Sequence, residues 1–246
     1  MPGPRDSSSF LTTTYTDCHF ISPYNLVKYT IMNAEFLALS IVILLFSVIL
    51  HEVCHGLMAL RFGDRTAELA GRLTLNPIPH IDPVGTILLP LIFIVLPLLT
   101  GVSTHFFIGW AKPVPINPLH FKNIRTGELM VSMAGVGANF GLAILAAILY
   151  NLGGNLVHNS FLLEALLRFT VGINLMLGIF NLLPIPPLDG SKVLLSQLPY
   201  NLAREYERYS QYGIIILFAL LYFGIISAIL QLIIFPLYTL LGVPPL

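Results

Sequence analysis

Two histidines and a glutamate stand together in an otherwise apolar stretch of the sequence, at His51, Glu52 and His55. The histidines are four residues apart, so in a helix both imidazoles lie on one face and can bind one metal ion. Glu52 then lies at the flank of that face, within reach of a metal-bound water. A cation lowers the pKa of such a water to about 7, and a nearby carboxylate takes its proton. The motif therefore indicates metal-assisted hydrolysis.

A hydrolytic metal site needs a third protein ligand and an open position for water. Asp189 is one candidate, because the prolines before it interrupt a helix and free its carboxylate to turn toward the metal. Asp82, on a proline-flanked loop, is the second candidate. Glu128 or Glu164 would suit a peptidase whose third ligand is a glutamate. In the simplest alternative no metal is bound, and the histidines and Glu52 satisfy one another.

The composition places these residues in a membrane protein, surrounded by the lipid bilayer. Hydrophobic residues make up 56% of the 246 residues and charged residues only 10%, whereas soluble domains have about 25% charged residues. The net charge is zero, so nothing points to a nucleic-acid partner. Uncharged stretches predict an all-α polytopic membrane protein with about four full transmembrane helices. We expect helices near residues 34–60, 85–100, 128–150, 167–185 and 211–235, after a polar tail at 1–33, with residues 34–246 forming a single membrane-embedded domain.

The positions of Lys and Arg predict the orientation of these helices. Basic clusters follow the first predicted span, precede the third and follow the fourth, whereas residues 151–165 have no Lys or Arg. All three clusters are therefore expected on the cytoplasmic side. Segment 85–111 has basic flanks at both ends, which predicts a re-entrant hairpin that lines a cavity. The first and fourth spans then run parallel, so His51, His55 and Asp189 lie at a similar depth.

Further polar residues are expected near the metal. Asn139 and Asn181 lie in predicted spans, where one of them holds the substrate backbone or the developing oxyanion, or both make interhelical hydrogen bonds. His80 either assists at the site or fastens its own loop. Ala67–Thr74 alternates like a short strand near the active site, to whose edge an extended substrate would add. The stretch Trp110–Asn117 would offer a second edge.

Three motifs of this chain resemble those of the site-2 protease family of intramembrane zinc metalloproteases. They are His51-Glu52-Val53-Cys54-His55, the loop from Asn76 to Gly85, and the run from Asn181 to Leu188-Asp189-Gly190. The resemblance covers about residues 35–200. It implies that His51, His55 and Asp189 bind Zn²⁺ and that Glu52 activates the water.

The resemblance implies a zinc-dependent intramembrane endopeptidase that cuts single-pass membrane proteins within or next to a transmembrane segment. We expect it in the plasma membrane, with the active site opening toward the cytoplasm. One alternative is a non-catalytic metal carrier or scaffold, which has no use for Glu52 and needs a file of polar residues across the bilayer. The other is a membrane-bound zinc peptidase for soluble substrates, with Glu128 or Glu164 as the third ligand.

Overall fold

The structure is a computed structural model that describes residues 23–89, 91–92, 95 and 109–246. Contacts within the chain separate two units, Met1–Glu35 and Phe36–Leu246, and the larger unit carries all the motifs. Most of the predicted polar tail, and most of the segment between 90 and 108, lie outside the described residues.

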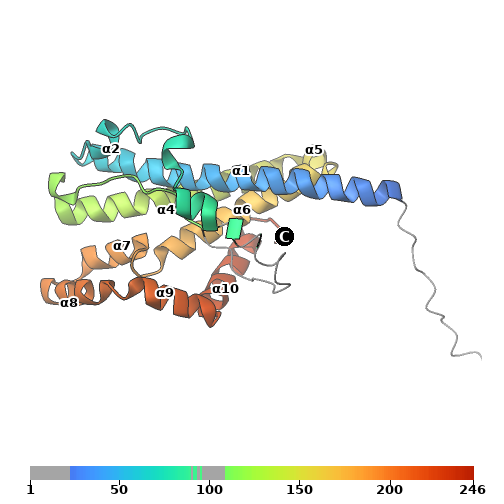
Figure 1. Cartoon of the computed structure of the whole chain (residues 1–246). Coiled ribbons are helices and arrows are strands. Elements are labelled where there is room, and N and C mark those ends of the chain that lie inside the picture. Colours follow the sequence, from blue (N-terminus) through green and yellow to red (C-terminus); the bar gives the residue numbers. More distant parts are fainter. Residues whose placement is uncertain (1–22, 90, 93–94, 96–108) are drawn as a thin grey trace, which may run out of the picture. The chain divides into compact units, whose positions relative to one another are not determined.

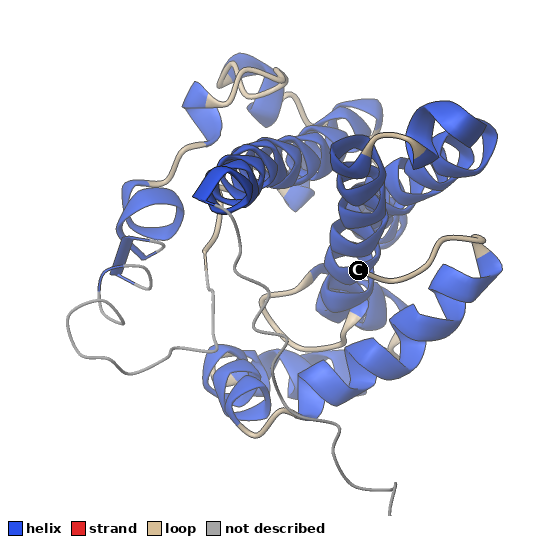
Figure 2. Cartoon of the chain, turned by 90° about the vertical axis from the view of Figure 1, so that its right-hand side faces the viewer, coloured by secondary structure: helices blue, strands red, loops and turns tan. Residues whose placement is uncertain are grey.

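The described part of the larger unit consists of helices joined by turns and extended links, with no strand among these residues (Figures 1 and 2). The long helices are α1 (Pro23–Arg61), of which the part from Phe36 belongs to this unit, α4 (Ile124–Leu152) and α6 (Phe161–Leu182). The shorter helices are α2 (Thr66–Leu69), α5 (Gly154–His158), α7 (Asp189–Gln197), α8 (Tyr200–Ser210), α9 (Gly213–Tyr222) and α10 (Ile225–Leu240). Short 3-10 or π-helical turns are η1 (Ile78–His80), η2 (Pro83–Leu88) and η3 (Pro118–His120).

Three helices of the described chain are long and apolar enough to cross a membrane: Ala34–Arg61, Ile124–Leu152 and Phe161–Leu182. The helices α9 and α10 together make a fourth candidate span, bent by 75° at the break between them. The single helix predicted near 211–235 is therefore interrupted. The break falls at Gly224, whose φ of 72° is left-handed and carries no steric cost for glycine. The structure confirms a helical membrane protein with three or four spans.

The prediction of a strand-like segment at Ala67–Thr74 is wrong. The chain forms the short helix α2 at Thr66–Leu69 and turns after it, and Asp64 accepts a 3.0 Å hydrogen bond from the backbone N–H of Thr66 where the helix begins. The backbone N–H of Arg72 then donates to the carbonyl of Ala67 at 2.9 Å. These local bonds use backbone groups that an edge strand would offer to a substrate.

The predicted hairpin at 85–111 is described mainly at its two ends. At the first end, the π-helical turn η2 is capped by Asp82, whose side chain accepts a 2.7 Å hydrogen bond from the N–H of Gly85. At the second end, the backbone N–H of Trp110 donates to the carbonyl of Gly85 at 3.2 Å. The Trp110 ring packs so closely on Gly85 that a Cβ there would lie 2.4 Å from it. The two ends of the segment therefore lie against each other.

The core of the larger unit lies where α4 packs against α6, and residues of α10 join it (Figure 1). Small residues allow this close approach, which is a main source of helix association in membranes. On α4 they are Ala143, Ala146 and Ala147, all buried. On α6, a Cβ at Gly178 would lie 3.2 Å from the ring of Phe140. This packing brings the polar residues in the middle of α4 and α6 together.

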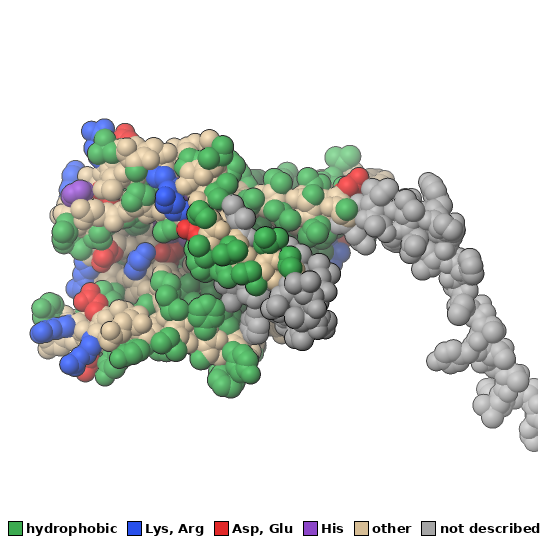
Figure 3. All heavy atoms as spheres, viewed as in Figure 1, with side chains coloured by type: hydrophobic (Ala, Val, Ile, Leu, Met, Phe, Trp, Pro, Cys, Tyr) green, Lys and Arg blue, Asp and Glu red, His purple; other side chains and the backbone are tan. Residues whose placement is uncertain are grey.

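Most Lys and Arg side chains visible in Figure 3 gather at one end of the larger unit, where α1 ends and α4 begins. Arg61, Arg65, Lys122 and Arg125 belong to this end. Along their length, the candidate spans carry many exposed apolar side chains, as surfaces in contact with lipid do.

Candidate metal centre

The helix α1 presents His51 and His55 one turn apart on one buried face, and the two side chains are 7% and 6% exposed. Asp189, the first residue of α7, is 6% exposed. The link at 183–188 between α6 and α7 is not helical. It contains three prolines, which lack the amide donor that a helix requires. This break ends α6 and lets Asp189 approach α1.

Three side-chain atoms of this group converge. The Nε2 atoms of His51 and His55 lie 2.8 Å apart. The Oδ2 atom of Asp189 lies 3.1 Å from Nε2 of His51 and 3.0 Å from Nε2 of His55.

The other ring nitrogen of each histidine has its own partner. Nδ1 of His55 lies 2.7 Å from the backbone carbonyl oxygen of Val131. A carbonyl only accepts, so Nδ1 carries the proton and Nε2 of His55 presents a lone pair. Nδ1 of His51 lies 2.7 Å from Oδ1 of Asn139, which has the same consequence. Three acceptor atoms therefore face one another. A proton satisfies only one pair of them, whereas a metal ion satisfies all three, and two imidazoles with a carboxylate suit zinc.

The helix α4 passes directly beside the two imidazoles at Gly135. A Cβ on this residue would lie 2.5 Å from Cε1 and Nε2 of His55 and 2.8 Å from Cε1 of His51. Among the described atoms, nothing lies within 4 Å of a Cβ at Gly137 or Gly141. Only position 135 therefore requires glycine for the approach of α4 to the site.

Asp189 is held in its ionised form. Its second oxygen, Oδ1, lies 3.6 Å from Nζ of Lys192, one turn further along α7. Burial acts to raise the pKa of Asp189, but a proton held between Asp189 and an imidazole Nε2, together with the charge of Lys192, outweighs burial and holds that pKa well below its usual range. The carboxylate is therefore charged at neutral pH, as metal binding requires.

Glu52 lies beside this triad, with a carboxylate oxygen within 4.8 Å of a ring nitrogen of each histidine. Its Oε2 accepts a 2.8 Å hydrogen bond from the backbone N–H of Val114. Asp189 approaches both imidazoles much more closely, so Asp189 suits the role of ligand. Glu52 occupies a position from which a carboxylate can exchange a proton with a metal-bound water.

Val114 belongs to an extended segment, 109–117, which the loops around the site hold in place. The backbone N–H of Lys112 donates to the carbonyl of His80 at 2.9 Å. The buried side chain of Arg72 donates to the carbonyl of Lys112 at 2.7 Å. These contacts fix the donor that holds Glu52.

The predicted second edge at Trp110–Asn117 is poor in donors for a substrate strand. Pro113 and Pro115 have no N–H. The amide of Lys112 is bound to a carbonyl, and that of Val114 is bound to Glu52. Because strand addition relies on free backbone donors and acceptors, residues 112–115 offer an added strand no free amide.

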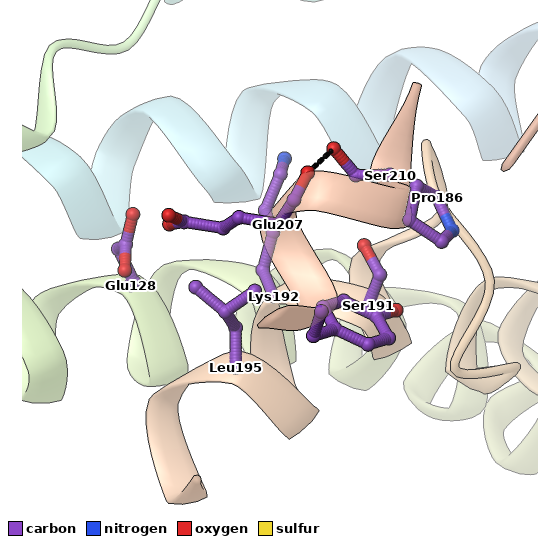
Figure 4. Close-up of a pocket in the computed structure, with 8 residues that line it drawn as sticks. Glu128, Pro186, Ser191, Lys192, Leu195, Glu207 and Ser210 are labelled. Atoms are coloured by element: carbon purple, nitrogen blue, oxygen red, sulfur yellow. Dashed lines mark hydrogen bonds between the residues drawn. The ribbon is translucent and has the colours of Figure 1, made fainter. Parts of the chain in front are cut away.

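A polar cavity of about 210 Å³ opens between α4, α7 and α8 (Figure 4). It is lined by Glu128, Pro186, Ser191, Lys192, Leu195, Tyr206, Glu207 and Ser210. The carboxylate of Glu207 points toward that of Glu128 in Figure 4. Lys192 also contacts Asp189, so the cavity adjoins the metal centre and is polar and wide enough to hold water.

The structure places the other predicted site residues differently. Asn139 is fully buried and contacts His51. Asn181 is half-buried, and its Nδ2 donates to the carbonyl of Leu177 in its own helix at 3.0 Å. His80 is 2% exposed, and its Nε2 lies 3.0 Å from the carbonyl oxygen of Thr74 in the preceding loop.

The alternative third ligands lie elsewhere. Asp82 caps η2, Glu128 lines the cavity, and Glu164 lies 3.6 Å from Arg168 in an ion pair on α6. In the described part of the chain, none of these three carboxylates is hydrogen-bonded or ion-paired to His51 or His55.

Sequence reasoning missed two residues that connect to this site, Asn174 and Ser47. Asn174 bonds to Asn139 and to Ser47, and all three are buried. The available signal was that Asn174 is an amide inside a predicted span and that Ser47 stands one helical turn before His51.

Comparison with known proteins agrees with this geometry. Residues 151–224 match the family model described as Peptidase family M50. YwhC of Bacillus subtilis, which bears the name of a zinc metalloprotease, is 35% identical over 190 residues, which cover 73% of this chain and 78% of YwhC. The chain belongs to peptidase family M50.

Two further relatives of this M50 protein are named Rip2 and also bear the name of zinc metalloproteases. Rip2 of Mycolicibacterium smegmatis is 33% identical over 72% of this chain and 64% of its own length. Rip2 of Mycobacterium tuberculosis (strain H37Rv) is 31% identical over 72% of this chain and 63% of its own length. The solved structures gave no significant match. The predicted resemblance to site-2 proteases is confirmed: the M50 protein is an intramembrane zinc metalloprotease.

Proposed function

We propose that His51, His55 and Asp189 hold the zinc ion of this protease and that Glu52 is its general base. The observation that supports this assignment is the convergence of three acceptor atoms within 3.1 Å of one another, with the Glu52 carboxylate beside them. Two histidines, one carboxylate and an open position for water form the ligand set of hydrolytic zinc sites.

The chain's own residues move the proton of the reaction. Zinc, when bound, lowers the pKa of its water to about 7. Glu52 takes the proton of the attacking water and afterwards gives it to the leaving amide nitrogen. The N–H of Val114 holds Oε2 of Glu52, which leaves the second carboxylate oxygen for the proton. Asn181 stays our candidate for holding the substrate carbonyl, whereas we assign His80 to fastening its loop.

The depth of the site supports a substrate inside the bilayer. A helix rises about 1.5 Å per residue, so His55 and His51 lie roughly 9 and 15 Å before the end of α1 at Arg61. Both are inside the candidate span Ala34–Arg61. The bond to be cut therefore lies within or next to the transmembrane segment of a single-pass membrane protein, which must be extended locally before water can reach it.

The site opens toward the cytoplasm in this proposal, and the protein resides in the plasma membrane. The basic residues gather at the end of the larger unit nearest the metal centre (Figure 3), and basic ends of membrane proteins face the cytoplasm. The cavity beside Lys192 lies at that end and offers a route for water. The contact between Trp110 and Gly85 supports a hairpin at 85–111, because the segment returns to its own start. That residues 34–246 form one domain stays a prediction.

The test is cleavage of a membrane-embedded reporter helix by the purified full chain in lipid vesicles, with zinc content measured in parallel. We expect Glu52→Gln to lower the cleavage rate at least about 100-fold and to keep its zinc. The matched control is Glu68→Gln, which removes an exposed carboxylate paired with Arg65 and should cleave like wild type.

Other outcomes of the same experiment identify the alternatives. If wild type and Glu52→Gln both bind zinc and neither cleaves any of several helices, the protein is a metal carrier or scaffold. Cleavage of soluble peptides alone would point to a membrane-bound peptidase for soluble substrates. A Glu52→Gln variant as fast as wild type would overturn the mechanism.

A further inference from the structure

A chain of buried hydrogen bonds starts on α1 at Ser47, crosses to α6 and α4, and returns to α1 at His51. Asn174 donates from Nδ2 to Oγ of Ser47 at 2.9 Å. Asn139 donates from Nδ2 to Oδ1 of Asn174 at 3.0 Å, and its own Oδ1 lies 2.7 Å from Nδ1 of His51. Asn139 and Asn174 are 0% exposed and Ser47 is 1% exposed. This hydrogen-bonded chain lies behind the metal centre, away from water.

Two backbone carbonyls fix which group donates and which accepts in every bond of this chain. The hydroxyl of Ser47 donates to the carbonyl of Ile43 at 2.8 Å, so its oxygen is left to accept from Asn174. Nδ2 of Asn174 also donates to the carbonyl of Thr170 at 3.0 Å. If the Asn174 amide were turned over, its oxygen would face that carbonyl with no proton between them. The oxygen of Asn174 must therefore face Asn139.

The same logic carries on to the zinc ligand. Because Asn174 offers an oxygen, the Asn139 amide must direct its nitrogen toward Asn174 and its oxygen toward His51. An amide oxygen only accepts, so Nδ1 of His51 must carry the proton. Nε2 then keeps the lone pair that a metal ion needs. A reversed Asn139 would favour a proton on Nε2, and His51 could not bind the metal in that form.

From this chain of hydrogen bonds we infer that Asn174 and Ser47 are positioning residues, which act through Asn139 to hold His51 in the tautomer that binds zinc. His55 obtains the same result in one step from the carbonyl of Val131. The inference rests on the proposed role of His51 as a ligand. It differs from a purely structural role of Asn174, in which the amide only joins α6 to its neighbours and the tautomer of His51 does not depend on it.

The test uses the full chain in lipid with two readouts that need no protease activity. The first is the ring tautomer of His51 in zinc-free protein, from NMR of ¹⁵N-histidine, with the signal assigned by its loss in His51→Gln. The second is the zinc Kd from competition with a chelator. Loss of an outer partner of a metal-binding histidine costs about 10–100-fold in affinity.

We expect Asn139→Leu to raise the zinc Kd within that range and Asn174→Leu to raise it about 10-fold, at its lower end. Both variants should lose the Nδ1 proton in part of the His51 population, whereas wild type should keep Nδ1 protonated throughout. Ser47→Ala should change both readouts in the same direction by less. The matched control is Asn151→Leu, an amide on α4 that bonds the carbonyls of Ala147 and Leu241, and it should keep the wild-type values.

The inference is overturned if Asn174→Leu and Ser47→Ala keep the wild-type zinc Kd and His51 tautomer, while Asn139→Leu raises the Kd and changes the tautomer. If Asn174→Leu does not fold, Ser47→Ala decides alone, because it removes only one oxygen atom. Failure of the proposed function would appear differently: wild type itself would not bind zinc, or His51→Gln would bind zinc as tightly as wild type.

Discussion

The backbone N–H of Val114 donates a 2.8 Å hydrogen bond to Oε2 of Glu52. The proposed general base is thus held by the main chain of an extended segment instead of by another side chain. That segment is fixed in turn, because the carbonyl of His80 accepts from Lys112 and the side chain of Arg72 donates to the carbonyl of Lys112. Residues distant in the sequence therefore control the position of Glu52.

Proline at position 114 tests this contact, because it removes the N–H that Glu52 accepts. We expect Val114→Pro to lower kcat about 10–100-fold, since a misplaced catalytic group costs that much, and to keep its zinc. The measurement is kcat for the reporter helix together with bound zinc. Val114→Ala is the control, because it keeps the N–H while removing much of the buried side chain. Equal kcat values for the two variants would show that the hydrogen bond is dispensable.

A methyl group at Gly135 should weaken metal binding. Its Cβ would lie 2.5 Å from Nε2 of His55, so α4 and the imidazole must move apart. We expect Gly135→Ala to weaken zinc binding more than 10-fold in a chelator competition, because loss of even an outer partner costs about that much. Gly137→Ala, on the same helix with open space around it, should bind zinc like wild type. Equal zinc affinities for both variants would contradict the close approach of α4.

Asp189→Asn separates this proposal from one with a glutamate as the third ligand. Loss of the charged oxygen that faces both imidazoles should raise the zinc Kd by more than the roughly 10–100-fold typical of an outer partner. Glu128→Gln and Glu164→Gln should leave the Kd near the wild-type value, since Glu128 lines the neighbouring cavity and Glu164 pairs with Arg168. Zinc retained in Asp189→Asn but lost in either glutamate variant would reverse the assignment.

Acid should break the contact that holds the far end of the extended segment 109–117, at Asp64. This fully buried carboxylate accepts from the backbone N–H of Asn117 at 2.7 Å and lies 2.9 Å from Nδ1 of His120. Burial acts to raise the pKa of Asp64, but hydrogen bonds from Thr66, Asn117 and His120 outweigh it and lower this pKa to about 2.

Because the folded-state pKa lies below the unfolded value of about 4, Asp64 stabilises the fold above pH 4 and loses this contribution as the pH falls toward 2. Hydrogen exchange at the Asn117 amide, corrected for its intrinsic pH dependence, should accelerate in that window. In Asp64→Asn the exchange should be faster at pH 5 and should not change further. A wild-type profile as flat as that of the variant would show that Asp64 does not anchor the segment.

Much of the site could be predicted from the sequence because its signals are local or chemically costly. The spacing of His51 and His55 places them on one face of any helix, and polar groups inside a span demand a function. The link from Asn181 to Asp189 carries three prolines, each of which lacks the amide donor that a continuing helix requires. The basic clusters predict an orientation in the same way, since Lys and Arg are enriched in cytoplasmic loops.

The tertiary structure decided what depends on neighbours distant in the sequence. In place of a strand at Ala67–Thr74, the chain forms α2 (Thr66–Leu69) and the turns after it, and the side chain of Asp64 binds the backbone N–H of Thr66 before this helix. Alternation of residue types does not reveal this contact. Asn139 looked equally suited to a substrate or to another helix. Only the packing of α4 between α1 and α6 shows that it faces His51 and Asn174. The sequence by itself determined which few groups are candidates to bind the metal, whereas the packing of three helices decided which ring nitrogen of His51 faces His55 and Asp189.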